Sequence, residues 1–283
     1  MTDFDDFWAG TLAAPKKLDA TFAPAWMKAI EVFDVTFNGF DGEPVQAWLA
    51  LPRGTTAPLP CVVEFPGYSK GRGLAHESLL YAAAGYAHLM MDVRDQSGRK
   101  AGFMTLGMLD PETYYYRRVI ADAVRAVEAA RSHPLVDSSR VAVAGESQGG
   151  GLALAVAALV PDVIAVAADV PFLCDFRRGA ELATAGPYPE IAQYLALHRD
   201  HLDRVFETLN YFDAVNFAER AQCPALFSVA LMDLSCPPAT VYSAFHAYAG
   251  PRRIEVYPFN GHEGGEAFHA GVRLRFLADA FGE

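Results

Sequence analysis

One pentapeptide in this chain has the residue types and spacing of an activated nucleophile. Gly145-Glu146-Ser147-Gln148-Gly149 matches G-x-S-x-G, follows an apolar run and precedes a small-residue helix pattern. That strand-turn-helix context is what the motif requires, because the strained turn must lift the serine hydroxyl above a sheet. Side chains two residues before and after the serine would crowd such a turn. The pattern therefore predicts acyl transfer through Ser147, and a glycine-rich turn with an incidental serine is the alternative.

A serine hydroxyl is a weak nucleophile at neutral pH and needs a neighbouring base. In this kind of strand-turn-helix site the chain order is serine, then acid, then histidine. His262 has the expected place, since it follows the last apolar strand within the short segment Asn260–Gly265. His269 is the nearest rival, but it falls inside the final helix pattern, where it would pack or face solvent. The other six histidines all precede the expected position.

The acid should end a strand between the serine and the histidine. Asp233 follows the apolar run 225–231 and precedes the rigid turn Cys236-Pro237-Pro238. Asp169 also ends an apolar strand and is the main competitor, whereas Asp213 could simply cap a helix. Asp233 would accept the Nδ1–H of His262, fix its tautomer and stabilise the imidazolium.

Two backbone N–H groups should stabilise the oxyanion that forms during acyl transfer. The first is the N–H of Gln148, directly after the nucleophile. The second should follow an early strand, where Phe65-Pro66-Gly67-Tyr68 stands and makes the Tyr68 N–H the candidate. An ordinary Pro-Gly turn is the alternative interpretation.

Alternating apolar strands and helices must carry these residues. This rhythm predicts a mostly parallel sheet covered on both faces, and together with the G-x-S-x-G turn it indicates an α/β-hydrolase fold. We expect a single domain over 1–283, with 172–221 as a helical, cap-like insertion, and a loop-rich stretch over 1–30 anchored by Trp8 and Trp26. Expected strands are 32–37, 45–51, 61–65, 88–91, 141–144, 164–168, 225–231 and 254–257, and expected helices are 114–131, 148–160 and 268–281.

Composition excludes several classes of function. The formal net charge of −11 would repel a nucleic-acid backbone. The four cysteines form no Cys-x-x-Cys pair, so neither a zinc knuckle nor a redox pair is indicated. The acidic N-terminus lacks the features of a signal peptide, and no apolar stretch would span a bilayer. We expect a cytoplasmic protein with no membrane or nucleic-acid partner, no cofactor and no metal.

Several motifs together resemble the acetyl xylan esterase and cephalosporin C deacetylase family, carbohydrate esterase family 7. The resemblance runs from about Val32 to the end of the chain. It is carried by Gly67-Tyr68, Arg94-Asp95-Gln96, the run from Asp110 to Arg118, Gly145 to Gly151, Pro171-Phe172-Leu173, Asp233 with Cys236-Pro237-Pro238, and His262-Glu263.

The resemblance implies deacetylation of small substrates such as acetylated xylo-oligosaccharides and the antibiotic ester cephalosporin C. It implies an intracellular homo-oligomer, often a hexamer. It also implies a catalytic triad of Ser147, Asp233 and His262, with Tyr68 and Gln148 as oxyanion donors. Phe172 and Pro237 would wall a short acyl pocket.

Arg94 and Gln96 match the family's Arg-Gly-Gln signature, which implies structural support and an ion pair between Arg94 and Glu263. The sequence departs from the family at three places. Pro66 replaces a histidine, Asp95 replaces the signature glycine, and the stretch 96–107 is shorter than the usual loop. That loop commonly contributes to subunit contacts, so a smaller assembly than a hexamer is an alternative.

Other functions remain as alternatives. An esterase of the same fold with a different short-chain ester, or a non-catalytic hydrolase-fold binding protein, would share most of these features. A prolyl-oligopeptidase-type enzyme would need a propeller ahead of this domain, which about thirty residues cannot build. A dienelactone-type hydrolase would prefer a cysteine nucleophile.

Overall fold

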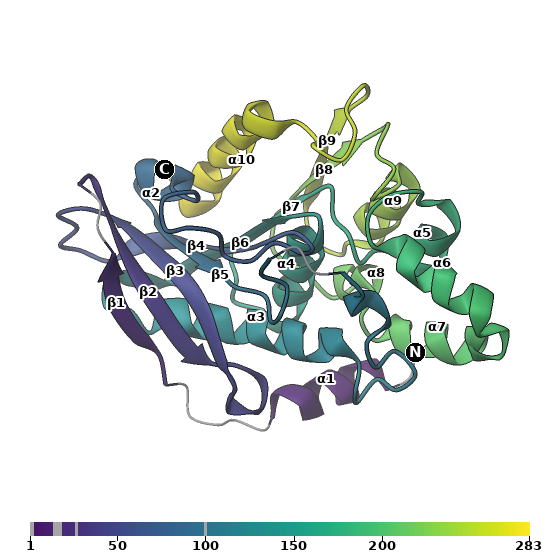
Figure 1. Ribbon diagram of the computed structural model, residues 1–283. Coiled ribbons are helices and arrows are strands. Elements are labelled where there is room, and N and C mark those ends of the chain that lie inside the picture. The colour runs from purple at the N-terminus through teal and green to yellow at the C-terminus, as the bar shows by residue number, and fades with distance from the viewer. Residues whose placement is uncertain (1–2, 14–18, 26–27, 99–100) are drawn as a thin grey trace.

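The computed structural model describes residues 3–13, 19–25, 28–98 and 101–283 (Figure 1). Its strands are β1 (Thr21–Ala25), β2 (Ile30–Asn38), β3 (Pro44–Pro52), β4 (Leu59–Phe65), β5 (Ala87–Met91), β6 (Val136–Glu146), β7 (Val166–Asp169), β8 (Ala225–Ala230) and β9 (Arg252–Tyr257). Its α-helices are α1 (Phe4–Leu12), α2 (Leu80–Ala83), α3 (Tyr115–Arg131), α4 (Gln148–Leu159), α5 (Phe176–Leu182), α6 (Tyr188–Leu197), α7 (Leu202–Asn210), α8 (Ala214–Ala218), α9 (Pro238–Ala247) and α10 (Glu266–Phe281).

Within these residues the strands form one sheet in the order β1-β2-β3-β5-β4-β6-β7-β8-β9. The pairs from β1 through β3 to β5 are antiparallel, and every pair from β5 to β9 is parallel. Helices cross between most of the parallel strands, as parallel pairing requires. The mostly parallel sheet is therefore as predicted. Because the parallel strands end at one edge, the loops that follow β4, β6, β8 and β9 can meet there.

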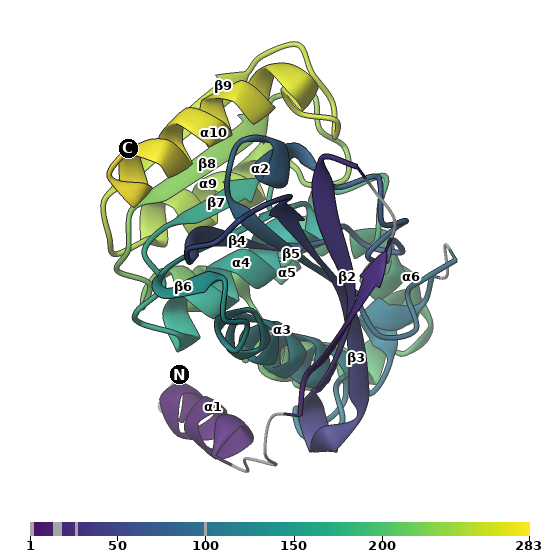
Figure 2. The ribbon, with the colours of Figure 1, turned by 90° about the vertical axis from the view of Figure 1, so that its left-hand side faces the viewer.

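Both faces of the sheet are covered, and the strand sequences show why. In β4, Cys61, Val63 and Phe65 point into the larger core, while Val62 points into a second core on the opposite face. Alternate residues of a strand point to opposite faces, so an uninterrupted apolar run suits a strand buried on both sides. Helices α3 and α4 cover the first face, and α2 and α10 cover the second (Figure 1 and Figure 2).

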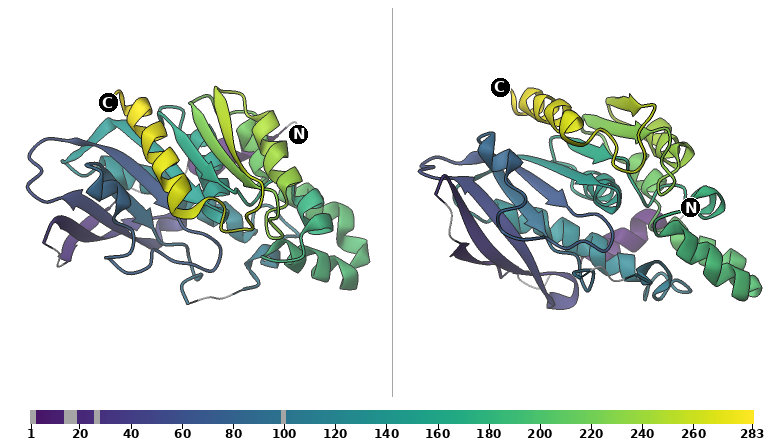
Figure 3. Two further views of the ribbon diagram at one scale, coloured as in Figure 1. Left: turned by 90° about the horizontal axis from the view of Figure 1, so that it is seen from above. Right: turned by 45° about the horizontal axis from the view of Figure 1, so that its top comes forward.

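Four helices, α5 to α8, separate β7 from β8 and fall within the segment where a helical insertion was expected. Figure 3 shows the green helices of this segment at the end of the molecule opposite the purple N-terminal strands. Tyr188 at the start of α6 is fully buried, and its ring lies 4.3 Å from that of Phe172, three residues after the end of β7. The segment thus packs onto the core at the edge where the parallel strands end.

The N-terminal stretch corrects one expectation. Residues 1–30 were expected to be loop-rich, but the chain forms α1 and the edge strand β1 there. Trp8 is buried as predicted, and its indole N–H donates to the backbone oxygen of Tyr211 at 3.0 Å. Tertiary contacts with α7 and α8 therefore stabilise a helix that its short local pattern did not indicate. Trp26 lies outside the described residues.

Helices α2 and α9 were also missed. Helix α2 is only four residues long, and α9 begins at the prolines that were interpreted as a turn. Proline suits the first helical position as well as a turn, so the local signal is ambiguous. Among the described helices, none combines the length and apolar character that crossing a bilayer demands.

Candidate active site

The turn between β6 and α4 has the geometry that the pentapeptide predicts. Ser147 has φ 57° and ψ −120°, a conformation rare for a residue with a side chain. A Cβ atom on Gly145 would lie 2.2 Å from the backbone carbon of Gly149, and one on Gly149 would lie 1.9 Å from the backbone oxygen of Phe65. Only glycine fits at either position, and the close approach leaves Ser147 at the carboxyl edge of the sheet.

Ser147 lies within hydrogen-bond distance of the predicted base. Its Oγ is 3.0 Å from Nε2 of His262, and Nδ1 of His262 is 2.8 Å from Oδ2 of Asp233. Ser147 and Asp233 are buried, while the His262 side chain is 34% exposed. Three residues far apart in sequence therefore form one continuous hydrogen-bonded chain. Its order, hydroxyl to imidazole to carboxylate, is that of a serine hydrolase.

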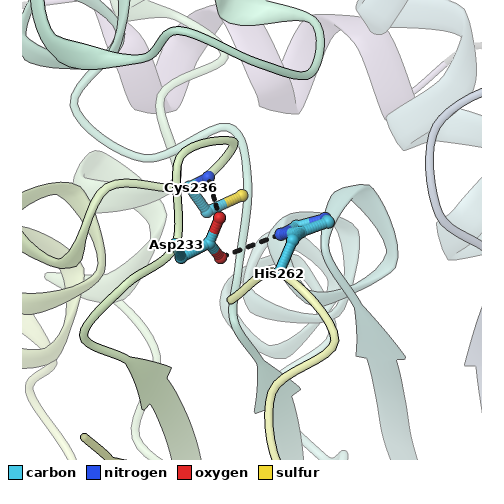
Figure 4. A group of neighbouring side chains, drawn as sticks. All are labelled: Asp233, Cys236 and His262. Atoms are coloured by element: carbon cyan, nitrogen blue, oxygen red, sulfur yellow. Dashed lines mark hydrogen bonds and ion pairs between the residues drawn. The ribbon is translucent and has the colours of Figure 1, made fainter. Parts of the chain in front are cut away.

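Backbone donors hold the Asp233 carboxylate in place. Its Oδ1 accepts the N–H of Ser235 at 2.8 Å. The same oxygen accepts the N–H of Cys236 at 2.9 Å, which leaves Oδ2 for His262 (Figure 4). The tight turn before Pro237 thus aims the carboxylate. This orientation makes Nδ1 of His262 the donor and leaves the Nε2 lone pair to accept the Ser147 proton.

The ligand atoms of Asp233, Cys236 and His262 lie within 4.8 Å of one another, which raises the question of a metal. Burial raises the pKa of the Cys236 thiol well above its usual value, so the thiol keeps its proton at neutral pH. The imidazole and the carboxylate are already joined to each other. We therefore interpret Asp233 and His262 as partners in proton transfer, with Cys236 contributing its backbone N–H rather than its thiol.

The two expected oxyanion donors belong to segments that adjoin Ser147 in the chain or in the sheet. Gln148 opens α4 directly after Ser147, and Tyr68 follows β4, which pairs with β6. Among the described residues, neither backbone N–H donates to a protein acceptor. Such N–H groups at the start of a helix and in a neighbouring loop are suited to a developing negative charge.

Comparison with known proteins adds independent information on this arrangement. A family model described as acetyl xylan esterase (AXE1) matches residues 1–280. The chain belongs to the acetyl xylan esterase family. This confirms the resemblance inferred from the sequence, and the family is one of carboxylic ester hydrolases.

Individual acetyl xylan esterase relatives are similar over most of this chain. An acetyl xylan esterase from Paenibacillus sp. R4 is 39% identical with a TM-score of 0.93, covering 99% of this chain and 95% of that one. Acetyl xylan esterase 1 from Thermoanaerobacterium sp. JW/SL YS485 is 32% identical with a TM-score of 0.89, covering 98% and 93%. These structures confirm the α/β-hydrolase fold.

A further relative is longer than this chain. Acetyl esterase Axe7A of Xylanibacter ruminicola is 29% identical over 291 residues, which cover 92% of this chain and 63% of the relative. The chain thus spans less than two thirds of the length of that protein.

The resemblance implied structural support from Gln96, and in this family member its side chain joins the loop that bears Tyr68 to the start of α4. Gln96 and Gln148 form a buried pair of reciprocal amide hydrogen bonds at 2.9 and 3.0 Å. Gln96 Oε1 also accepts the N–H of Ser69 at 3.0 Å, and Gln148 Oε1 accepts the hydroxyl of Tyr116 at 2.7 Å. The loop bearing Tyr68 is thereby connected to the helix that begins beside Ser147.

The expected ion pair between Arg94 and Glu263 is wrong. Arg94 instead pairs with Asp122 of α3 and with Glu43. Glu263 is exposed and accepts the N–H of Gly261 at 3.0 Å, inside its own loop. Four strands separate β5 from β9, which is roughly 24 Å at about 4.8 Å per strand, beyond the reach of an ion pair.

A contact between Tyr68 and the helical segment was not expected. The Tyr68 hydroxyl donates to Glu190 of α6 at 2.9 Å and accepts the N–H of Phe103 at 2.9 Å. Burial and the neighbouring Glu190 raise the pKa of Tyr68, so the hydroxyl remains protonated. The residue with the candidate oxyanion N–H is thus tied to α6 through its side chain.

Phe172 and Pro237 were expected to wall the acyl pocket. Phe172 is fully buried, and its N–H donates to the backbone oxygen of Ser147 at 2.9 Å. Pro237 is buried at the start of α9, and its backbone oxygen accepts the N–H of Thr240 at 2.8 Å. Phe172 thus contacts Ser147 directly, Pro237 follows the turn that holds Asp233, and the contact of either residue with an acyl group stays a prediction.

The rival acids and the rival base have other partners. Asp169 and His269 are paired with each other, with Nε2 of His269 2.8 Å from Oδ1 of Asp169. Asp213 caps α8 and accepts the N–H groups of Val215, Asp175 and Phe176 at 2.8 to 3.0 Å. Burial raises the pKa of Asp213 to about 6 despite these donors. In the described part of the chain, the side chains of Asp169, His269 and Asp213 make no hydrogen bond to the side chain of His262 or of Ser147.

Several supporting residues had no local sequence signal for their role. Tyr116, Glu190 and the backbone donors of Ser235 and Cys236 are identified only by their contacts. Asp122 did carry a signal, because a carboxylate within the mostly apolar pattern of α3 implies a buried cationic partner.

Proposed function

We propose that this protein is a serine carboxylesterase that removes acetyl groups from small substrates through an acyl-serine intermediate. The observation that carries the proposal is the hydrogen-bonded chain from Ser147 through His262 to Asp233. Membership of the acetyl xylan esterase family supports the choice of an acetyl ester.

The proposed reaction uses only the groups described above. Ser147 Oγ attacks the acetyl carbonyl carbon while its proton moves to Nε2 of His262. The N–H groups of Tyr68 and Gln148 bind the oxyanion, each donor being worth about 3 kcal/mol in such sites. His262 then protonates the leaving oxygen, and the acetyl group remains on Ser147. Water repeats these steps and releases acetate.

Acetylated xylo-oligosaccharides and cephalosporin C are the substrates that we propose. The names of the acetyl xylan esterases similar to this chain support the first. Phe172 and Pro237 would keep the acyl pocket short.

We further propose that 1–283 acts as one hydrolase domain in which 172–221 caps the site. The contact between Tyr68 and Glu190 supports this, because it joins the segment to the oxyanion loop. The family resemblance supports a cytoplasmic location and a homo-oligomer.

The direct test uses a chain-length series of p-nitrophenyl esters. We expect the acetyl ester to give the highest kcat/KM and Ser147→Ala to lose kcat on the order of 10⁶-fold. A fluorophosphonate probe should label the wild type and spare Ser147→Ala. Equal turnover by both proteins would exclude Ser147 as the nucleophile, and failure of the wild type to label would favour a non-catalytic binding protein.

The substrate class needs a separate comparison. Acetate release from acetylated xylo-oligosaccharide and from cephalosporin C should be measured on the same enzyme preparation, with Ser147→Ala as the blank. Activity on p-nitrophenyl acetate without activity on either substrate would indicate a different short-chain ester.

A further inference from the structure

We propose that Asp169, His269 and Tyr257 form a positioning network that holds the loop bearing His262 against the turn bearing Ser147. The inference rests on the proposed function, because it assigns a role in aligning the proposed base with the proposed nucleophile. None of the three residues belongs to the hydrogen-bonded chain of Ser147, His262 and Asp233. They act through the segments that carry two of its members.

The first contact closes the base of the loop. Tyr257 is the last residue of β9, and His269 lies in the first turn of α10. The tyrosine hydroxyl donates to Nδ1 of His269 at 2.8 Å. Residues 258–265, which include His262, lie between these two ends. A single side-chain bond therefore joins the start and the finish of the loop.

The second contact ties this loop to the nucleophile. Nε2 of His269 donates to Oδ1 of Asp169, the last residue of β7, at 2.8 Å. The backbone oxygen of the same Asp169 accepts the N–H of Ser147 at 2.9 Å. One residue thus contacts both the strained turn and the helix that follows the loop. A displacement of α10 relative to β7 would change the distance between His262 and Ser147.

Asp169 and His269 are buried together, and the negative charge of Asp169 is compensated by Arg273. Asp169 and His269 are both less than 10% exposed, and Nη1 of Arg273, one turn further along α10, lies 2.6 Å from Oδ2 of Asp169. Burial by itself would raise the pKa of Asp169, but Arg273 and His269 together lower it below the usual range. The carboxylate therefore remains charged at neutral pH, where charge-assisted hydrogen bonds are strong.

Close packing limits other positions of the loop. A Cβ atom on Gly265 would lie 2.2 Å from the Tyr257 ring, so the backbone of the loop rests on that ring. A Cβ atom on Gly264 would lie 3.4 Å from Val170, which directly follows Asp169. Val170 itself has φ +38°, and its N–H donates to Oγ of Ser228 at 3.1 Å. Strain of this kind persists only where surrounding contacts enforce it.

The network is not a second proton relay. Both ring nitrogens of His269 are used, one by Tyr257 and one by Asp169. Neither nitrogen is left to accept a proton from a nucleophile or a substrate. A positioning role is the one that these contacts fit.

Two mild variants test the inference. Tyr257→Phe removes one hydroxyl and keeps the ring that supports Gly265, and His269→Gln shortens the bridge to Asp169. We expect kcat on p-nitrophenyl acetate to fall about 10- to 100-fold in both, because misplacement by roughly 1 Å can cost that much, with KM changing less than about threefold. Backbone amides of residues 258–266 should exchange with deuterium faster than in the wild type.

A matched control separates positioning from general stability. His133, just before β6, is another buried histidine; its Nδ1 accepts the N–H of Leu135 at 3.3 Å and its ring packs against Phe22 and Phe33, away from the loop. His133→Gln should lower the free energy of unfolding without lowering kcat or changing exchange in residues 258–266. Asp169→Asn, which keeps an acceptor for His269, should recover part of the kcat that Asp169→Ala loses.

The inference is overturned if Tyr257→Phe and His269→Gln fold, keep kcat within about twofold of the wild type, and show unchanged exchange in the loop. A wild type that hydrolyses no acetyl ester would instead contradict the proposed function. In that case the exchange measurement would still decide whether the network holds the loop.

Discussion

At the scale of single residues, the chemistry depends on which nitrogen of His262 carries the proton. The orientation of the Asp233 carboxylate decides which nitrogen is protonated, because the N–H groups of Ser235 and Cys236 both donate to Oδ1. Only Oδ2 faces His262, where it accepts from Nδ1. The lone pair of Nε2 is then directed at Ser147. The turn after β8 thus acts on the nucleophile through two intervening side chains.

Asp233→Asn should test this dependence. The amide oxygen would keep the two backbone donors and turn its NH₂ group toward His262, which favours the wrong tautomer. We expect kcat to fall by about 10⁴-fold with KM little changed, as measured by steady-state kinetics on p-nitrophenyl acetate.

Asp213→Asn is the matched control, because Asp213 is another buried aspartate that accepts backbone N–H groups. It should lose stability while retaining kcat. If the two variants lost kcat equally, Asp233 would have no special role as the orienting acid.

At the scale of secondary-structure elements, the site depends on how closely α4 approaches β4 and β6. The three consecutive glycines of Gln148-Gly149-Gly150-Gly151 place backbone against backbone at the start of the helix. Such residues are costly inside a helix because of their backbone freedom. Their presence here follows from the close approach, which in turn lifts Ser147 out of the sheet.

Gly149→Ala should therefore be severe. The new Cβ would lie 1.9 Å from the backbone oxygen of Phe65, and neither backbone can move aside easily. We expect a loss of more than about 3 kcal/mol in the free energy of unfolding, measured by urea denaturation.

Gly10→Ala in α1 supplies the control for that measurement. It has no neighbouring atom within 4 Å of the new Cβ, and alanine there should stabilise the protein by up to about 1 kcal/mol. A Gly149→Ala protein as stable as the wild type would show that α4 can shift away from β4.

At the scale of the whole molecule, exposed apolar residues gather around the last edge strand. Strand β9 ends the sheet, and a strand edge can pair with another chain. Phe259, directly after it, is 88% exposed, and Phe268 in α10 is 78% exposed. Isolated exposed apolar residues are ordinary, whereas groups of them are typical of contact surfaces.

We expect the protein to be a homo-oligomer in solution. Light scattering coupled to size-exclusion chromatography should give a multiple of the 30.7 kDa chain mass. The number of subunits would show whether the shorter stretch 96–107 changes the assembly. A mass of one chain at micromolar concentration would contradict the expectation.

Sequence pattern was sufficient for much of the fold and for the three residues that the structure joins by hydrogen bonds. The glycines around Ser147 indicate a tight turn because side chains would clash there, and the chain order of serine, acid and histidine led to Asp233 and His262. Apolar runs located the buried strands because burial on both faces leaves no room for polar residues. The sequence by itself therefore indicated Ser147, Asp233 and His262, together with the strand-helix rhythm around them.

The tertiary structure decided the contacts between distant residues. It paired Asp169 with His269, joined Arg94 to Asp122 rather than to Glu263, and brought Glu190 to Tyr68. Each partner lies between 28 and 122 positions away in the chain. Spacing along the sequence carries no information about such pairs, because they form only when the sheet order and the packing of helices set which side chains meet.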